Sequence, residues 1–259
     1  MQVDDDLDLL TGAARAAGEI GLRFAETGAQ SWDKPGGAGP VTEADLAVDM
    51  LLAERLRTAR PGYGWLSEES TDGPARLDSD RVFIVDPIDG TREFISGGRA
   101  WAHALAVVEH GRVIAAAIHL PRLDKLYAAA AGRGATLNGR PIRVTARTEL
   151  TGAHVLAAKP SYDAHNWRGA VPELSRAYRP SLAYRLSLVA EGRYDAMMTL
   201  RDSWEWDVAA GELILREAGA QVSDRRAGPL RFNNTVPKVN GVVAAGPVLH
   251  AALTGALAE

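Results

Sequence analysis

The chain has 259 residues, of which 46% are hydrophobic and 24% are charged, and these ordinary values exclude a disordered chain. A formal net charge of −4 argues against a nucleic-acid polymer as partner, because phosphate backbones attract a basic face. The chain has no cysteine, no apolar run near the ~20 residues of a membrane helix, and an acidic start, so we expect a cytoplasmic protein without a membrane span.

Two helices are predicted near the N-terminus, with a loop between them. The first is predicted from apolar residues at helical spacing, Leu10, Ala13, Ala17, Ile20 and Phe24. The second is predicted from the same spacing of Leu46, Met50, Ala53 and Leu56. Residues 31–40 contain the run Lys-Pro-Gly-Gly-Ala-Gly-Pro, which is too rich in glycine and proline for a helix or strand and predicts a mobile loop.

Strands dominate the next part of the chain. A short strand is predicted at 64–67, and an apolar, β-branched strand at 81–85 is stopped by Pro87. Residues 104–144 predict an antiparallel meander, in which Asn138-Gly139 is a strong signal for a two-residue hairpin turn.

After residue 147 the pattern changes to alternating strands and helices. Strands are predicted at 154–158, 194–199 and 241–245, and helices at 181–191, 207–218 and 247–257. We therefore expect an α+β half at 1–147, with two helices and an antiparallel sheet, and an α/β half at 148–259. No linker is long enough to make the halves independent.

Four separated groups of acidic residues are candidates for a functional site: Asp45; Glu68 with Glu69; Asp86 with Asp89; and Asp207. Each has a structural alternative. Asp45 can form a capping box with Thr42, and Asp207 can cap the helix that follows it. Glu68 and Glu69 can be a solvated strand end, and the run from Asp86 to Asp89 can be an ordinary turn.

Taken together, the acidic groups favour a metal site. Asp86 follows an apolar strand and so lies at a carboxyl end, where α/β sheets bind ligands. We expect Pro87 to force a turn that brings Asp86 and Asp89 together and frees the Ile88 carbonyl. Carboxylates with a backbone carbonyl are the oxygen ligands that Mg²⁺ prefers. The chain has no cysteine and no Gly-x-Ser-x-Gly elbow, which weakens the case for nucleophilic catalysis.

Three ordered motifs carry a resemblance to a known family. They are Glu68-Glu69, the run Asp-Pro-Ile-Asp-Gly-Thr from Asp86 to Thr91, and the run Trp-Asp-Val-Ala-Ala-Gly that contains Asp207. In this order they resemble the signature of the inositol monophosphatase superfamily, which comprises Mg²⁺-dependent, lithium-sensitive phosphomonoesterases. The resemblance covers nearly the whole chain and implies a layered αβαβα sandwich of the sugar-phosphatase type.

The resemblance also implies metal ligands. One Mg²⁺ would bind to Glu68, Asp86 and the Ile88 carbonyl, and a second to Asp86, Asp89 and Asp207. Glu69 would support this site or hold a third ion, with simple solvation as its alternative.

Catalytic and phosphate-binding roles follow from the same resemblance. Thr91 would orient the attacking water, Asp45 would polarise the Thr91 hydroxyl, and Glu68 could accept a proton. The N–H groups of Gly90 and Thr91 would hold the phosphate. Lys34 would reach the phosphate from its loop, with an exposed loop lysine as the alternative.

The substrate is suggested by residues around these motifs. The run Arg-Glu-Phe at 92–94, the run Glu-Trp-Asp at 205–207 and residues 188–192 resemble CysQ-type 3′(2′),5′-bisphosphate nucleotidases. Arg185 stands where that group usually has a lysine, which implies a contact with a second phosphate. However, residues 181–184 depart from the expected Gly-Ser pair, and a solvated charge on a helix is the alternative for Arg185.

We therefore expect hydrolysis of 3′-phosphoadenosine 5′-phosphate by metal-activated water. An inositol-1-phosphate phosphatase is the main alternative, and a non-catalytic regulatory binding protein on the same fold is an alternative of a different class. The expected partner is a small phosphorylated molecule, and a homodimer is left open.

Overall fold

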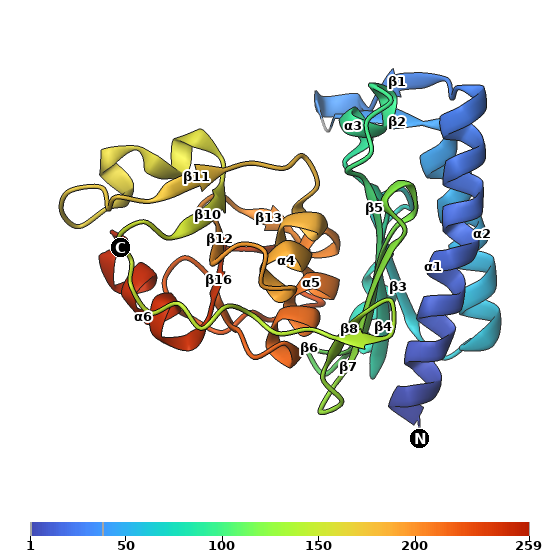
Figure 1. Cartoon of the computed structure of the whole chain (residues 1–259). Helices are drawn as coiled ribbons and strands as arrows, with labels where there is room; N and C mark the ends of the chain where they lie inside the picture. Colours follow the sequence, from blue (N-terminus) through green and yellow to red (C-terminus); the bar gives the residue numbers. More distant parts are fainter. Residues whose placement is uncertain (1, 38, 259) are drawn as a thin grey trace.

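In the computed structural model, which describes residues 2–37 and 39–258, helices and sheets alternate in layers (Figure 1). Helices α1 (Gln2–Thr27) and α2 (Glu43–Ala59) form one outer layer and cover a seven-stranded sheet. Helices α4 (Leu182–Ala190) and α5 (Glu205–Glu217) form the middle layer, and a five-stranded sheet and α6 (Pro247–Ala256) complete the far side. This arrangement confirms the predicted αβαβα sandwich.

The seven-stranded sheet has the order β3-β4-β5-β6-β7-β8-β9. Its strands are β3 (Gly64–Ser67), β4 (Arg81–Asp89), β5 (Ala102–Glu109), β6 (Arg112–Leu120), β7 (Lys125–Ala130), β8 (Ala135–Leu137) and β9 (Arg140–Pro141). Strands β3 and β4 are parallel, and the other neighbouring pairs are antiparallel. The predicted meander is confirmed, and its turn at Asn138 and Gly139 has the positive φ values, 49° and 77°, that a type I′ hairpin requires.

Alternate side chains of this sheet enter two different cores. Phe83 and Val85 of β4 pack with the apolar residues of α1 and α2. Val82 and Ile84 of the same strand point to the other face and pack with α4 and α5. This two-residue period is what a strand buried on both faces produces.

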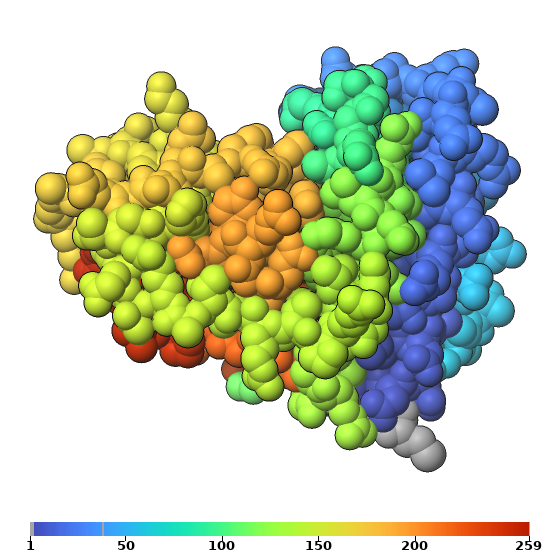
Figure 2. All heavy atoms as spheres, in the orientation of Figure 1, coloured from blue at the N-terminus to red at the C-terminus, as the bar shows by residue number. Residues whose placement is uncertain are grey.

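The five-stranded sheet belongs to the second half of the chain and has the order β11-β10-β12-β16-β14. Its strands are β10 (His154–Ala157), β11 (Ser175–Ala177), β12 (Ala196–Thr199), β14 (Gln221–Ser223) and β16 (Val242–Ala245), and a separate short pair joins β13 (Ser203–Trp204) to β15 (Lys238–Val239). The predicted alternation of strands and helices is confirmed. On the face drawn in Figure 2, atoms of both halves are in contact without a gap. The boundary at residue 147 falls between β9 and β10 and stays a prediction.

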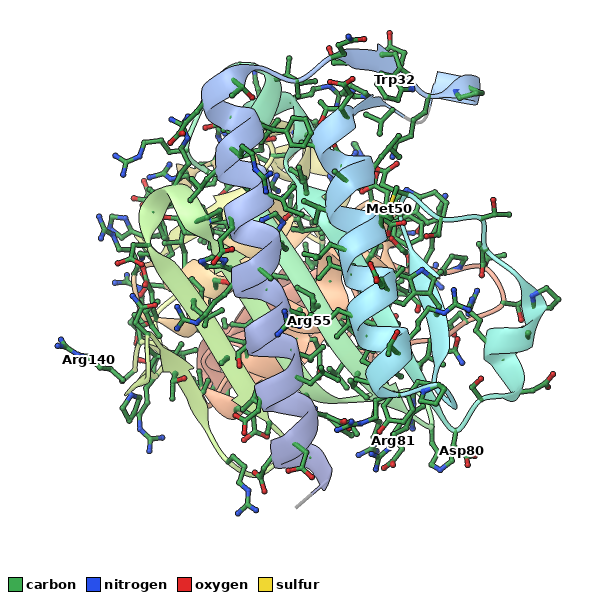
Figure 3. All side chains as sticks on the ribbon, turned by 90° about the vertical axis from the view of Figure 1, so that its right-hand side faces the viewer. Trp32, Met50, Arg55, Asp80, Arg81 and Arg140 are labelled. Atoms are coloured by element: carbon green, nitrogen blue, oxygen red, sulfur yellow. The ribbon has the colours of Figure 1, made fainter. Side chains whose placement is uncertain are left out.

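Helix α2 is present where it was predicted, but its buried face is a different one. Leu46 and Met50 belong to the apolar stripe that predicted the helix, yet they are 40% and 70% exposed, and Met50 lies on the outer side of α2 (Figure 3). The buried face carries Asp45, Val48, Asp49, Leu52 and Leu56. Two of these positions are carboxylates, which a hydrophobic count ignores.

The predicted loop at 31–40 is partly ordered as a hairpin. Strands β1 (Ser31–Asp33) and β2 (Pro40–Thr42) pair antiparallel, and Thr42 then caps α2. Ala38 of the predicted loop lies outside the described residues. The remaining short elements are α3 (Thr91–Ile95) and the 3₁₀ turns η1 (Pro35–Gly37), η2 (Pro74–Asp78), η3 (Pro121–Leu123), η4 (Lys159–Tyr162) and η5 (Ala164–Asn166). Among the helices of residues 2–37 and 39–258, none is long and apolar enough to cross a membrane.

Helix α1 approaches the sheet closely at Gly18 and Gly21, which gives a prediction about stability. A Cβ on Gly21 would lie 2.8 Å from the fully buried Trp101 ring, whereas a Cβ on Gly12 would be 3.5 Å from the flexible end of Arg55. Gly21→Ala should therefore lower the free energy of unfolding by about 1–3 kcal/mol through overpacking. Gly12→Ala is the matched control and should raise it by up to about 1 kcal/mol, because alanine favours helix.

Urea unfolding of the two variants measures both effects. Equal stability changes in the two would contradict the close packing of Gly21 on Trp101.

Candidate metal and phosphate site

The site begins with an irregularity in β4. The register with β5 shifts between Asp86, opposite Ala104, and Asp89, opposite Ala102, so β4 contains one extra residue there. Pro87 has no N–H to donate to the ladder, which explains a bulge at this point. The predicted turn at Pro87 is thus wrong, because the strand continues to Asp89 and the chain turns only at Gly90, where φ is 99°.

The bulge is fixed from behind by a buried histidine. The His103 ring on β5 donates from Nδ1 to the Pro87 carbonyl. His103 is completely buried, and burial lowers its pKa to about 3, so the ring is neutral. This contact holds the backbone between Asp86 and Asp89 in place.

Three carboxylates from different elements meet at this bulge. Glu68 follows β3, Asp86 is near the end of β4, and Asp207 is in the first turn of α5; one oxygen from each lies within 4.8 Å of the others. Glu68 and Asp86 come together because β3 and β4 are parallel neighbours and end at the same edge. Because α5 begins at Glu205, Asp207 lies inside the helix. The alternative prediction, in which Asp207 is the N-cap of this helix, is therefore wrong.

The environment of Asp86 fits a cation. Asp86 is 1% exposed, and neither of its carboxylate oxygens accepts a hydrogen bond from the described residues; when protonated, the Asp86 carboxyl can donate to Asp207. Burial and the neighbouring carboxylates raise the pKa values of Asp86 and Asp207 well above the usual range. A divalent ion with a preference for oxygen ligands would remove this electrostatic cost.

Asp89 and Ile88 line the same cavity, which has a volume of about 220 Å³, but they make other contacts as well. Asp89 Oδ2 accepts hydrogen bonds of 2.6 Å from Ser181 Oγ and from the Ala183 N–H, so it holds the N-terminus of α4. The Ile88 carbonyl accepts a hydrogen bond of 3.1 Å from Thr91 Oγ1. Asp89 is outside the group of three carboxylates, and sequence reasoning missed its contact with α4.

Asp45 contacts both Thr42 and Thr91, although the sequence predicted these two contacts as alternatives. Its Oδ2 accepts hydrogen bonds from the Thr42 N–H at 2.9 Å and the Thr42 hydroxyl at 2.5 Å, which completes the capping box of α2. Its Oδ1 accepts a hydrogen bond of 3.2 Å from Thr91 Oγ1. Burial raises the pKa of Asp45 to about 6. One carboxylate therefore joins the first helix layer to the cavity.

Lys34 is bound to the acidic pair. Its Nζ lies 2.7 Å from Glu68 Oε1 and 2.6 Å from Glu69 Oε1, and its side chain is 15% exposed. The exposed-lysine alternative is therefore wrong, and so is simple solvation of Glu69, whose side chain is 5% exposed. Burial raises the pKa of Glu69 to about 7. Contact of Lys34 with a phosphate, and of Glu69 with a third ion, stay predictions.

Arg185 is buried, so the alternative prediction of a solvated charge on a helix is wrong. The guanidinium donates to the carbonyls of Arg179 at 2.5 Å and Pro180 at 3.2 Å, and it lies 4.5 Å from the centroid of the Tyr178 ring. Tyr178 and Pro180 line the cavity, whereas Arg185 is behind them. Contact of Arg185 with a phosphate stays a prediction. Tyr178 was missed because an isolated aromatic residue in a loop carries no recognisable motif.

The raised pKa values give a prediction for stability. The folded-state pKa of Asp86 is raised above its unfolded value of 3.8, so the folded chain binds more protons, and stability falls as pH rises above that value. Asp86→Asn cannot ionise, so in chelator it should be more stable than wild type at pH 7.5, and this difference should shrink at pH 5. Asp80→Asn, an exposed carboxylate labelled in Figure 3, is the control and should show no such trend.

Denaturant unfolding in chelator at both pH values measures this difference. A gap between Asp86→Asn and wild type that does not change with pH would contradict an unneutralised charge at Asp86.

The whole chain is similar to known proteins. Residues 3–259 match the inositol monophosphatase family. An inositol-1-monophosphatase of Mesorhizobium japonicum is 33% identical, over 97% of this chain and 95% of that protein. A 3′-phosphoadenosine 5′-phosphate phosphatase of Mycobacterium leprae is 32% identical, over 98% and 94%. The Nus factor SuhB of Pseudomonas aeruginosa is 35% identical, over 84% of each.

Solved structures show the same architecture. The extragenic suppressor protein SuhB of Bartonella henselae has a TM-score of 0.82 and 30% identity, covering 97% of each chain. The IMPase of Thermotoga maritima has a TM-score of 0.82 and 26% identity, covering 97% of this chain and 96% of that one. The chain thus belongs to the inositol monophosphatase family.

Proposed function

We propose that this protein is a Mg²⁺-dependent phosphomonoesterase whose substrate is 3′-phosphoadenosine 5′-phosphate. The observation that carries the proposal is the group of Glu68, Asp86 and Asp207, in which the buried Asp86 accepts no hydrogen bond from the described residues, next to a hydroxyl–carboxylate pair. Membership of a family of phosphatases that is generally Mg²⁺-dependent supports the reaction class.

The proposed ligands for Mg²⁺ are Glu68, Asp86, the Ile88 carbonyl, Asp89 and Asp207. When bound, two such ions would supply Lewis acidity, which acidifies water and stabilises the departing alkoxide oxygen. A third ion at Glu69 is left open.

The remaining residues handle the water and the phosphate. The Thr91 hydroxyl is within hydrogen-bond distance of Asp45 Oδ1 and the Ile88 carbonyl, so its own oxygen can accept a hydrogen bond from water and orient it. Asp45 and Glu68 are the candidate proton acceptors. The N–H groups of Gly90 and Thr91 at the start of α3 would bind the phosphate oxygens, with Lys34 as a further cation near Glu68.

A bisphosphate substrate needs a cation away from the carboxylates. Arg92 lines the cavity, and its side chain forms no hydrogen bond with the rest of the described chain. We propose Arg92 as a contact for the second phosphate, while direct contact by Arg185 stays a prediction. The relative from Mycobacterium leprae, whose name states this substrate, supports the choice.

A second candidate function is hydrolysis of inositol 1-phosphate, which is favoured by the relative from Mesorhizobium japonicum. A regulatory binding protein is the candidate of another class, and a relative named as a Nus factor keeps it open. The presence of every proposed metal ligand favours an enzyme. The cytoplasmic location, the absence of a nucleic-acid partner and the homodimer stay predictions.

The test is a turnover panel at equal concentrations of 3′-phosphoadenosine 5′-phosphate, inositol 1-phosphate and fructose 1,6-bisphosphate. We expect the highest kcat/KM for the nucleotide, loss of turnover in chelator and recovery with Mg²⁺. Undiminished turnover after exhaustive chelation would reject the metal, and preference for inositol 1-phosphate would select the second candidate.

Thr91→Ala separates water orientation from metal binding. Without the hydroxyl, kcat should fall by about 10²-fold or more, because a positioned proton-handling group is lost. The rise in melting temperature on adding Mg²⁺ should remain. Thr91→Ser keeps the hydroxyl and should retain most of the rate, whereas Asp207→Asn should lose both the rate and the Mg²⁺-induced rise. Wild-type turnover in Thr91→Ala would exclude this role.

A further inference from the structure

An aromatic side chain forms part of the wall of the carboxylate cavity. Tyr178 lies in the segment between β11 and α4, which crosses from the five-stranded sheet toward α3 (Figure 1). Its side chain lines the same cavity as Glu68, Asp86 and Asp207. Tyr178 is nevertheless 49% exposed, so much of its surface has no protein partner.

Arg185 holds this ring in place. Its guanidinium lies over the ring at 4.5 Å from the centroid and donates to the carbonyls of the next two residues, Arg179 and Pro180. All three contacts are with consecutive residues of one segment, and Arg185 is only 7% exposed. Burying a guanidinium is costly, and burial lowers its pKa. The two hydrogen bonds and the contact with the ring offset this cost, and together they fix the segment.

Further contacts fix the same segment at both ends. Arg179 donates to the Tyr194 hydroxyl at 2.9 Å, and Ser181, at the N-cap of α4, donates to Asp89. The aromatic ring is therefore placed on a support that is tied directly to a candidate metal ligand. Such preorganisation suits recognition, because little conformational entropy is lost when a ligand binds.

We propose that Tyr178 stacks on the nucleobase of the substrate and that Arg185 is the positioning residue that presents the ring. The proposal rests on the proposed function and names the feature that would separate a nucleotide from an inositol phosphate. The guanidinium lies over the ring, and Tyr178 is half exposed and lines the cavity that would hold the phosphate. A heteroaromatic base has a π-face to offer that ring, whereas a cyclitol has none.

This role differs from direct contact between Arg185 and a second phosphate, and the two can be separated by substrate. Adenosine 3′-monophosphate has the base but only one phosphate, whereas 3′-phosphoadenosine 5′-phosphate has both. If Arg185 acts through Tyr178, its loss affects the two nucleotides equally. If it binds the second phosphate, its loss affects only the bisphosphate.

The experiment compares kcat/KM for both nucleotides with that for inositol 1-phosphate. In Tyr178→Leu the ratio of kcat/KM for a nucleotide to kcat/KM for inositol 1-phosphate should fall by about 5- to 150-fold, the range for loss of one base–aromatic stack. The fall should come from a higher KM for the nucleotide. Tyr178→Phe keeps the ring and should keep the ratio. Arg185→Gln should lower the ratio for both nucleotides. If the Arg185→Gln protein is unstable, Arg185→Lys serves as a milder variant. The double variant with Tyr178→Leu and Arg185→Gln should show little further loss beyond that of Tyr178→Leu alone.

Calorimetric binding of adenosine 3′-monophosphate with Ca²⁺ in place of Mg²⁺ gives a second measurement that does not require nucleotide turnover. We expect Tyr178→Leu to weaken this binding by the same factor. Unchanged binding and an unchanged ratio in Tyr178→Leu would overturn the stacking role, even if wild type hydrolyses the nucleotide. A loss in Arg185→Gln confined to the bisphosphate would overturn the positioning role. Failure of the proposed function itself would instead appear in wild type, as preference for inositol 1-phosphate.

Discussion

The repulsion between a buried carboxylate, Asp86, and two half-buried ones, Glu68 and Asp207, is the constraint on which the site depends. One oxygen each of Glu68, Asp86 and Asp207 lies within 4.8 Å of the others, and Asp86 accepts no hydrogen bond from the described residues. Burying like charges together costs several kcal/mol unless they are protonated or bound to a cation. Rigid elements hold the three carboxylates together against this repulsion. They are two parallel strand ends, a bulge that His103 fixes by a hydrogen bond, and the first turn of α5.

The site draws on both halves of the chain. Asp207 comes from the second half, and Asp89 from the first half holds the N-terminus of α4. Asp45 joins the outer helix layer to Thr91 while it also completes the capping box of α2. Asp45 thus has a structural role in the capping box and a contact with Thr91 at the same time, so one interpretation of this residue does not exclude the other.

The convergence of three acidic side chains could be predicted because each belongs to a short contiguous run near the end of a strand or the start of a helix. Glu68, Asp86 and Asp207 needed only the correct order of strands and helices to meet. The bulge at Pro87 was not predictable, since it depends on the register with β5. The buried face of α2 was misplaced because Asp49, which accepts hydrogen bonds from two serines, lies inside while Met50 lies outside. The burial of Arg185 depends on a loop aromatic that has no sequence signature.

The most direct test of the carboxylate group is anomalous diffraction from crystals soaked in Mn²⁺, which replaces Mg²⁺ at oxygen sites. We expect anomalous density bound to Asp86 and to at least one of Glu68 and Asp207, at about 2.1 Å from the carboxylate oxygens. A map at saturating Mn²⁺ with no density near Asp86, and with the three carboxyls unmoved, would contradict the assignment of this cavity as a metal site.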